Sequence, residues 1–396
     1  MRLIYMDHAA TTPLDPVVRE GMLPWLGSDS GFGNPASATH GYGRAASAAV
    51  DHARQQVASL LQAPAEGVVF TGSATEAINL AILGRLRFVM QRNRGRHIIT
   101  CATEHSAVLG ACEQAQREGA ELTVLPVDGA GRLSLSALRS ALRDDTALVS
   151  LMLVNNETGV VHDIPAVAAA LRDHPARLHV DVTQAIGKLP VDVSALGADL
   201  LSLSAHKFHG PKGIGALWRC PRPRLRLQPL QFGGGQEWGE RPGTQAVHQI
   251  VGLGLACEQA ARHLGSEGPR LQALRDRLEQ GLWEAGIPLQ RNGGVPRAPH
   301  ISNLSFPGVH GEALLAEVSS TLAIAAGSAC TSRSARGSHV LRAMGVGDAG
   351  LLSAFRFSFG RDSNADDIDE AVAVLSRGVR RLLSFSPLGD EVETHD

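Results

Sequence analysis

The sequence predicts an α/β protein with a large domain on a mostly parallel seven-stranded sheet and a smaller α+β domain. Between Val68 and Trp218, short apolar runs alternate with helical patterns, which is typical of a parallel sheet with crossover helices. After about residue 255, strands and helices are more segregated. The length of 396 residues, 44% of them hydrophobic, suffices for two to three domains at about 150 residues each.

The strands of the large domain are expected at seven apolar runs. Each run is apolar almost throughout, so each strand is expected to be covered on both faces. The runs are Val68–Phe70, His97–Thr100, Leu122–Leu125, Ala147–Val154, Leu178–Val182, Leu200–Leu203 and Ile214–Trp218.

Helices are expected between these strands. Leu135, Leu138 and Leu142 lie on one helical face, with Ser134 or Ser136 as the N-cap. Another helix, Ile164–Leu171, has Pro165 in its first turn, where the missing N–H costs little. A third covers Glu76–Leu83.

The smaller domain follows from three features near the C-terminus. Leu271, Leu274, Leu278 and Leu282 mark a long amphipathic helix, Ile301–Phe306 reads as a strand, and a last helix begins near Asn364. The predicted division is residues 16–254 for the large domain, with residues 1–15 and 255–396 in the small one.

Composition and charge argue against several classes of protein. The formal net charge of −2 favours neither nucleic acid nor an anionic membrane, so direct DNA binding is not expected. No apolar run approaches the roughly 20 residues of a membrane span, and the N-terminus does not resemble a signal peptide. The five cysteines are spread without C-x-x-C spacing, which favours reduced thiols in a cytoplasmic protein.

Polar residues gather where the apolar runs end. In open α/β sheets, ligands bind outside the carboxyl ends of the strands, so these clusters predict one pocket. The clusters are Gly72–Glu76, Thr103–His105, Asn155–Glu157, Asp181 with Gln184, and Ser204–Lys207.

The pocket has the requirements of pyridoxal 5′-phosphate. Ser73 to Thr75 open a helix whose free N–H groups suit a phosphate. Lys207 directly follows a buried strand, as Schiff-base lysines do, and Asp181 can pair with a protonated pyridine nitrogen. The same residues could instead have purely structural roles. Ser73 and Glu76 could form a capping box, and Asp181 and Lys207 could form an ion pair.

The chain resembles the pyridoxal-phosphate-dependent cysteine desulfurases of the class V aminotransferase superfamily, most closely the long-loop iron–sulfur assembly type. The resemblance implies the type I aminotransferase fold, acting as a homodimer with active sites at the subunit interface. It is carried in chain order by Asp7–Pro13, Phe32–Ser37, Thr75–Glu76, Thr103–His105, Val154–Gly159, His179–Gln184, Ser204–Lys207, Gly210–Gly213, Gly233–Glu237, Gly327–Cys330 and Arg356–Ser358.

The resemblance also implies the roles of the site residues. Lys207 resembles the lysine that bonds to the cofactor, Asp181 the partner of its ring nitrogen, and His105 the ring-stacking acid/base. The implied cofactor contacts are Ala74, Thr75, His105, Asn156, Asp181, Gln184, Ser204, His206, Lys207 and Thr244, the last contributed by the other subunit. Asn34, Asn156 and Arg356 are implied to bind the substrate carboxylate.

Cys330 decides the expected reaction. It lies among small polar residues, whereas a structural cysteine prefers an apolar setting. By resemblance it takes sulfur from L-cysteine as a persulfide, releases L-alanine, and passes the sulfur to an acceptor protein for iron–sulfur clusters or tRNA thiolation. No metal site is expected, except that Cys330 is a candidate ligand of a transient iron–sulfur cluster.

Two other functions stay open at this level: a selenocysteine lyase or class V aminotransferase, and a non-catalytic scaffold that binds partners. Trp238 stands where the family usually has arginine. Two basic runs, Arg85–Arg96 and Arg219–Arg226, are expected to be solvated surface rather than a contact for an acidic partner or tRNA.

Overall fold

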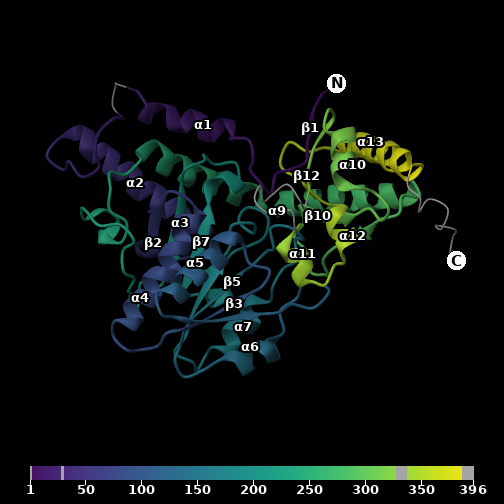
Figure 1. Ribbon diagram of the computed structural model, residues 1–396. Helices are drawn as coiled ribbons and strands as arrows, with labels where there is room; N and C mark the ends of the chain where they lie inside the picture. The colour runs from purple at the N-terminus through teal and green to yellow at the C-terminus, as the bar shows by residue number, and fades with distance from the viewer. Residues whose placement is uncertain (1, 28–30, 327–336, 386–396) are drawn as a thin grey trace.

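The computed structural model describes residues 2–27, 31–326 and 337–385. Within these residues, seven strands form the main sheet in the order β2-β8-β7-β6-β5-β3-β4 (Figure 1). Strands β3 to β7 run parallel, and β8 is antiparallel to both of its neighbours. The strands are β2 (Val68–Thr71), β3 (His97–Cys101), β4 (Glu121–Leu125), β5 (Thr146–Met152), β6 (Arg177–Asp181), β7 (Leu200–Ser204) and β8 (Gly215–Arg219).

Both faces of this sheet are buried, as the sequence predicts. Successive side chains of a strand point to opposite faces, and alternate residues here belong to two different apolar cores. In β7, for example, Leu201 and Leu203 pack in one core and Leu200 in the other. The predicted mostly parallel sheet of an α/β protein is therefore confirmed, with strand ends shifted by up to two residues, since β5 ends at Met152 rather than Val154.

Helices connect these strands. Ser134 is the N-cap of α6 and accepts a hydrogen bond from the Ala137 N–H, and Pro165 stands in the first turn of α7. The predicted helix over Glu76–Leu83 begins two residues earlier and continues through a π-helical stretch, Leu80–Gly84. The helices are α1 (Pro16–Met22), α2 (Gly41–Leu60), α3 (Ala74–Asn79), α4 (Arg85–Met90), α5 (Ser106–Arg117), α6 (Leu135–Ala141), α7 (Ile164–Ala170) and α8 (Val193–Leu196), with 3₁₀ turns at Leu23–Trp25, Ala65–Gly67, Ala205–Lys207 and Gln236–Gly239.

A second apolar core lies on the right of Figure 1, where α10 and α13 cover strands β10 and β12. Strand β1 pairs with β11 there, so the N-terminal segment joins this part as expected. The elements are β1 (Ile4–Tyr5), β9 (Gln290–Arg291), β10 (Ile301–Ser305), α10 (Gly311–Val318), β11 (Leu322–Ala323), β12 (Ala325–Ala326), α11 (His339–Ala343), α12 (Asp348–Leu352), β13 (Ala354–Ser358) and α13 (Ala365–Leu383).

Helix α9 (Val247–Glu284) runs between the two parts. Its first half, with Leu253 and Cys257, packs in the core of the large sheet, and its second half, with Leu271 and Leu278, packs in the other core. The predicted boundary at residues 254 and 255 falls inside this helix, and the division into domains stays a prediction.

Two further observations bear on the sequence predictions. Arg219 was expected on a solvated surface, but its side chain is buried against Glu240, because an acidic residue 21 positions away folds back onto it. Among the helices that the structure describes, none combines the length and apolar character needed to cross a bilayer.

Candidate active site

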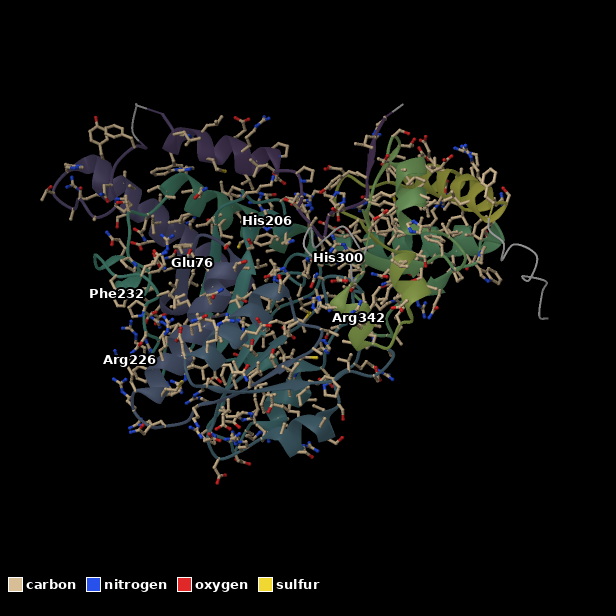
Figure 2. All side chains as sticks on the ribbon, in the orientation of Figure 1. Glu76, His206, Arg226, Phe232, His300 and Arg342 are labelled. Carbon is tan, nitrogen blue, oxygen red and sulfur yellow. The ribbon has the colours of Figure 1, made fainter. Side chains whose placement is uncertain are left out.

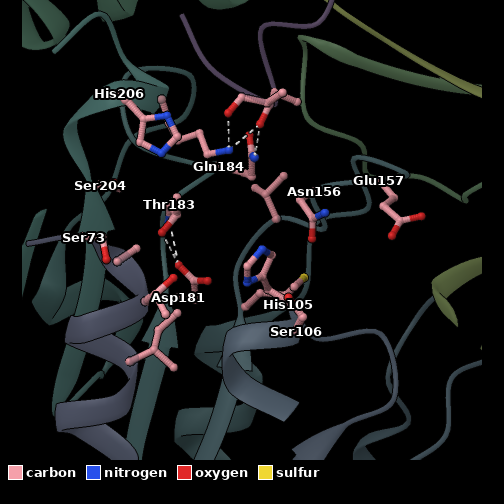
Figure 3. A pocket seen from close by; sticks show the side chains of 18 of the residues that line it. Ser73, His105, Ser106, Asn156, Glu157, Asp181, Thr183, Gln184, Ser204 and His206 are labelled. Atoms are coloured by element: carbon pink, nitrogen blue, oxygen red, sulfur yellow. Dashed lines mark hydrogen bonds between the residues drawn. The ribbon is translucent and has the colours of Figure 1, made fainter. Parts of the chain in front are cut away.

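A cavity of about 400 Å³ opens at the carboxyl ends of β3, β5, β6 and β7 (Figure 3). This is the edge at which the sequence predicts a pocket. Ten residues with predicted roles line it: Ala74, Thr75, His105, Asn156, Asp181, Gln184, Ser204, His206, Lys207 and Arg356.

Three residues with predicted roles do not line this cavity in the described structure. Asn34 is exposed, and its side chain accepts a hydrogen bond from the Ala36 N–H in a local turn. Thr244 is also exposed and is not among the residues that line the cavity. Cys330 lies outside the described residues, so its predicted roles as sulfur carrier and cluster ligand stay predictions.

The start of α3 forms one wall. Ser73 caps the helix by accepting a hydrogen bond from the Glu76 N–H. The predicted capping box is only half right, because the Glu76 carboxylate accepts from the Gly72 N–H at 2.5 Å and pairs with Arg241. Gly215 allows β8 to approach this turn, since a Cβ there would lie 2.6 Å from the Ser73 carbonyl carbon. The N–H groups of a helix start suit a phosphate.

His206 and Ser204 stand beside this wall. Burial lowers the pKa of His206 to about 4, so its imidazole is neutral at pH 7. His206 Nδ1 lies 3.2 Å from the Thr11 hydroxyl. When that hydroxyl donates, the hydrogen of the neutral ring is on Nε2, where it can be donated to an anion.

Lys207 is held at the end of β7, in the 3₁₀ turn that follows the strand. Its ammonium donates hydrogen bonds to the carbonyl oxygens of Ala9 at 2.7 Å and Ala10 at 2.8 Å. The N-terminal segment thus reaches across from the smaller core to orient the amine.

Asp181 ends β6 and is 6% exposed. Its Oδ1 accepts two hydrogen bonds from Thr183, one from the N–H at 3.0 Å and one from the hydroxyl at 2.5 Å (Figure 3). This leaves Oδ2 for a ligand. Two residues earlier, His179 is fixed between Ser150 on β5 and Ser202 on β7, which locks the strand that carries Asp181.

His105 faces the cavity from the start of α5. Burial is the main cause that lowers its pKa, opposed by the charge of Asp181 and reinforced by Lys207 and His339. Its Nδ1 accepts a hydrogen bond from the Ala107 N–H at 3.1 Å, so Nε2 carries the hydrogen of the neutral ring. The preceding Glu104 is fully buried, and this burial raises its pKa well above the usual range.

Arg356 closes the opposite wall. Its guanidinium donates to the Asn156 carbonyl oxygen at 2.9 Å and to Asp7 at 2.7 Å. Within the described structure, the Nε of Arg356 and the Oδ1 of Asn156 are both buried without a hydrogen-bond partner. A small polar ligand with a carboxylate and an amino group would satisfy an arginine donor and an amide acceptor of this kind.

Sequence reasoning gave no role to several residues that line the cavity. Thr183 could have been predicted from the sequence, because a hydroxyl two residues after an acidic residue commonly forms a hydrogen bond with that acid. His339 carried no local signal: it comes from the smaller part, and its Nε2–H donates a hydrogen bond to the Glu104 carbonyl oxygen, 2.9 Å away. Only donation is compatible with a carbonyl oxygen, so Nε2 bears the hydrogen. The others are Ala9, Ala10, Ile78, Ser106, Met152, Val154 and Glu157.

Known proteins are similar to this chain over most of its length. The family model described as aminotransferase class-V matches residues 4–371. The curated protein "Cysteine desulfurase IscS" of Photorhabdus laumondii is 48% identical over 385 residues, covering 97% of this chain and 95% of that protein. The protein of the same name from Histophilus somni is 46% identical over 387 residues, covering 98% and 95%.

Solved structures are similar over nearly the same length. A structure titled "NifS-like protein" superposes with a TM-score of 0.87 at 33% identity, covering 97% of this chain and all (100%) of that one. One titled "SspA in complex with cysteine" superposes with a TM-score of 0.79 at 36% identity, covering 90% and 98%.

Proposed function

Because this chain belongs to the class V aminotransferase family, we propose that it is a cysteine desulfurase, which uses pyridoxal phosphate to convert L-cysteine to L-alanine. The observation that carries the proposal is that Lys207, Asp181 and Arg356 meet in one cavity. Relatives named as cysteine desulfurases cover almost the whole chain, and a neighbouring structure holds cysteine by its title.

The residues of the cavity fit the cofactor. The proposed contacts are from Asp181 Oδ2 to the protonated ring nitrogen, from Lys207 to the aldehyde carbon, and from the start of α3 with Ser204 and His206 to the phosphate. Gln184, Asn156 and the face of His105 complete the proposed contacts. Once bound, the cofactor supplies an electron sink that weakens bonds to the substrate carbon next to its nitrogen.

The substrate is proposed to bind by its carboxylate. Arg356 Nε is the buried donor without a partner in the described structure, and Asn156 lies beside it. Asp7 and the Asn156 carbonyl hold the rest of the guanidinium, so the arginine is oriented before the substrate arrives. His105 is proposed to move the proton, because its ring lines the cavity while its Nδ1 accepts a hydrogen bond from the backbone of α5.

The sulfur is proposed to leave on Cys330. Its thiolate forms an S–S bond to the substrate sulfur as the C–S bond breaks. The electron pair of that bond stays with the substrate carbon, which takes up a proton and leaves as alanine. The persulfide then passes to an acceptor protein, an iron–sulfur scaffold or a tRNA thiolation relay.

The same proposal includes a homodimer in which Thr244 of one subunit binds the cofactor phosphate of the other. Thr244 is exposed in the single chain, which leaves its hydroxyl free to reach a second copy. A cytoplasmic location is proposed with it, because the four cysteines among the described residues are unpaired thiols.

The experiment compares Cys330→Ser with Cys220→Ser. Cys220 is a partly exposed thiol away from the cavity and serves as the matched control. With L-cysteine and a reductant, Cys330→Ser is expected to lose sulfide and alanine formation while still binding the cofactor, and Cys220→Ser to keep both. Sulfide release by Cys330→Ser at the unaltered rate would overturn the assignment.

A further inference from the structure

The segment 233–245, which carries Thr244, is held by an unusual set of contacts. Large apolar side chains are exposed on and next to this segment. Trp238, within it, is 46% exposed, and Phe232, just before it, is 88% exposed. Phe232 lies at the left margin of the molecule in Figure 2, far from the smaller core. The segment is therefore presented outward, although its acidic side chains are buried.

The backbone of the segment is strained at its centre. Glu237 has φ 47° and Trp238 has φ 57°, two consecutive left-handed conformations that non-glycine residues rarely adopt. Such a conformation persists only where the surrounding contacts hold it, and it often marks a site where geometry matters for function.

Glu237 is the central contact. Its carboxylate is 1% exposed and forms a bidentate pair with Arg54, at 2.8 and 2.9 Å. It also accepts from the Phe70 N–H at 3.0 Å and from Gln245 Nε2 at 2.5 Å. Gln245 is the neighbour of Thr244, so one buried carboxylate connects strand β2, helix α2 and the residue beside Thr244.

Trp238 and Glu240 extend this contact. The guanidinium of Arg54 lies over the rings of both Phe70 and Trp238, 4.7 and 4.8 Å from their centroids. Arg219 lies 5.4 Å from the same Trp238 ring and pairs with buried Glu240 at 2.6 Å. The arginine that the family usually has at position 238 would place a third cation beside Arg54 and Arg219.

Stability alone does not account for such an arrangement. Buried ion pairs generally stabilise a fold no better than well-packed apolar residues, whereas they do hold groups in one defined geometry. Here the buried ion pairs hold a strained turn, and Thr244 is the next residue along the chain with a proposed role.

We propose that Arg54, Glu237, Trp238, Arg219 and Glu240 are positioning residues that set Thr244 for the cofactor phosphate of the partner subunit. The inference rests on the proposed function, in which Thr244 acts across the dimer. It predicts that damage to this network in one chain weakens phosphate binding in the other chain's site.

The test uses heterodimers with a single lysine-bearing site, assembled from differently tagged chains. In the first, a Lys207→Ala chain pairs with a Glu237→Gln chain, so the lysine-bearing site receives Thr244 from an intact network. In the second, a Lys207→Ala/Glu237→Gln chain pairs with an unaltered chain, so that site receives Thr244 from the altered network. Affinities for pyridoxal phosphate and pyridoxal are measured from the visible absorbance of the lysine-bound cofactor.

The second heterodimer is expected to bind pyridoxal phosphate about tenfold more weakly than a Lys207→Ala/unaltered reference, the size of one hydrogen bond to a charged group. Its affinity for pyridoxal, which has no phosphate, is expected to be unchanged. The first heterodimer is expected to match the reference for both compounds. Equal weakening in both heterodimers, weakening in the first alone, or no weakening overturns the proposal.

Two variants separate the possible failures. Thr244→Ala replaces Glu237→Gln in the same pairings: if it has no effect across the dimer, the premise about Thr244 fails, and if it has one while Glu237→Gln does not, only the positioning network fails. Glu279→Gln breaks a comparable buried pair with Arg297, at 2.7 and 3.0 Å, in the smaller core. It is expected to lower the melting temperature without changing cofactor affinity. If Glu237→Gln does not fold, Gln245→Ala is used in its place.

Discussion

At the scale of single residues, neutral imidazoles give the cavity its character. Burial lowers the pKa of His105 and takes that of His206 to about 4, so neither ring is charged at pH 7. The cations around the cavity are then the lysine and arginine side chains, which a bound phosphate and carboxylate can neutralise. A neutral ring, unlike the charged one, also has a nitrogen that can take up a proton, which a proton-transferring residue needs.

The pH dependence of turnover follows from His105. A histidine with a lowered pKa loses its proton at a lower pH than usual, so the neutral ring is present down to a pH below about 6.5. We expect a bell-shaped profile of kcat/KM with its optimum on the alkaline side of neutral and an acid limb centred below about 6.5. Steady-state rates of alanine formation between pH 5 and pH 10 measure this, and an optimum below pH 6 would contradict the role of His105.

Asp181 supplies the second prediction at this scale. Asp181→Asn keeps the size and the contact with Thr183 but removes the charge that holds the ring nitrogen protonated. We expect kcat to fall by a factor of about 10²–10⁴, the usual size for loss of a charged or proton-transferring group. Asp199→Asn is the matched control, because Asp199 pairs with Arg177 at the far end of β7; a similar loss there would mean that the effect is structural.

At the scale of elements, the site depends on how closely strand β8 approaches the start of α3. The side chain of Ser73 caps this helix and the backbone of β8 lies directly beneath the cap. A sheet with parallel strands brings its carboxyl ends to one edge, but only a glycine at this point lets the helix start sit low enough to join them.

Gly215→Ala tests this close approach. A Cβ at this position would lie 2.6 Å from the Leu203 carbonyl oxygen and from the Ser73 carbonyl carbon, and these backbone atoms cannot give way cheaply. We expect a loss of about 1–3 kcal/mol in the free energy of unfolding, typical of overpacking, together with weaker binding of pyridoxal phosphate. Urea unfolding and cofactor titration measure the two effects.

Gly110→Ala is the control for that change. Gly110 lies in the middle of α5, and a Cβ there would meet nothing within 4 Å. Because alanine is the better helix former, this variant is expected to be up to about 1 kcal/mol more stable with unchanged cofactor binding. Equal behaviour of the two variants would exclude the close-packing argument.

At the scale of the whole molecule, buried histidines couple the fold to pH. Burial lowers the pKa of His162 to about 4 and that of His179 to about 4. Between that pH and about 6.5, these histidines are protonated in the unfolded chain but neutral in the folded chain. Their contribution to the free energy of unfolding is therefore fully present above about pH 6.5 and is lost as the pH falls toward 4. Each group accounts for up to about 3 kcal/mol of this loss.

Equilibrium unfolding in urea at pH 7.5 and pH 5 measures this dependence. His162→Phe is expected to reduce the difference between the two pH values, because the ring that resists protonation is gone. His263→Gln, at an exposed position of α9, is expected to leave the difference unchanged. A difference that His162→Phe does not alter would mean that other groups control acid stability.

Much of the site was within reach of sequence reasoning because its signals are local. The buried strands can be recognised as apolar runs. Asp181 lies at the end of one run, and His105 and Lys207 come within a few residues after the ends of two others. Residues that join from a distance left no such signal: His339 reaches the cavity from α11, and Arg219 is buried by Glu240 rather than solvated.

The amino-acid sequence by itself determined the alternating strands and helices, the caps, and the edge of the sheet where polar groups meet, because these follow from periodicity and from contacts between residues a few positions apart. Only the tertiary structure decided which distant residues share the cavity and how the segment around Glu237 and Trp238 is held in its left-handed turn. Those features depend on burial and charge pairing between positions as far apart as Arg54 and Glu237, and a one-dimensional pattern carries no information about such pairs.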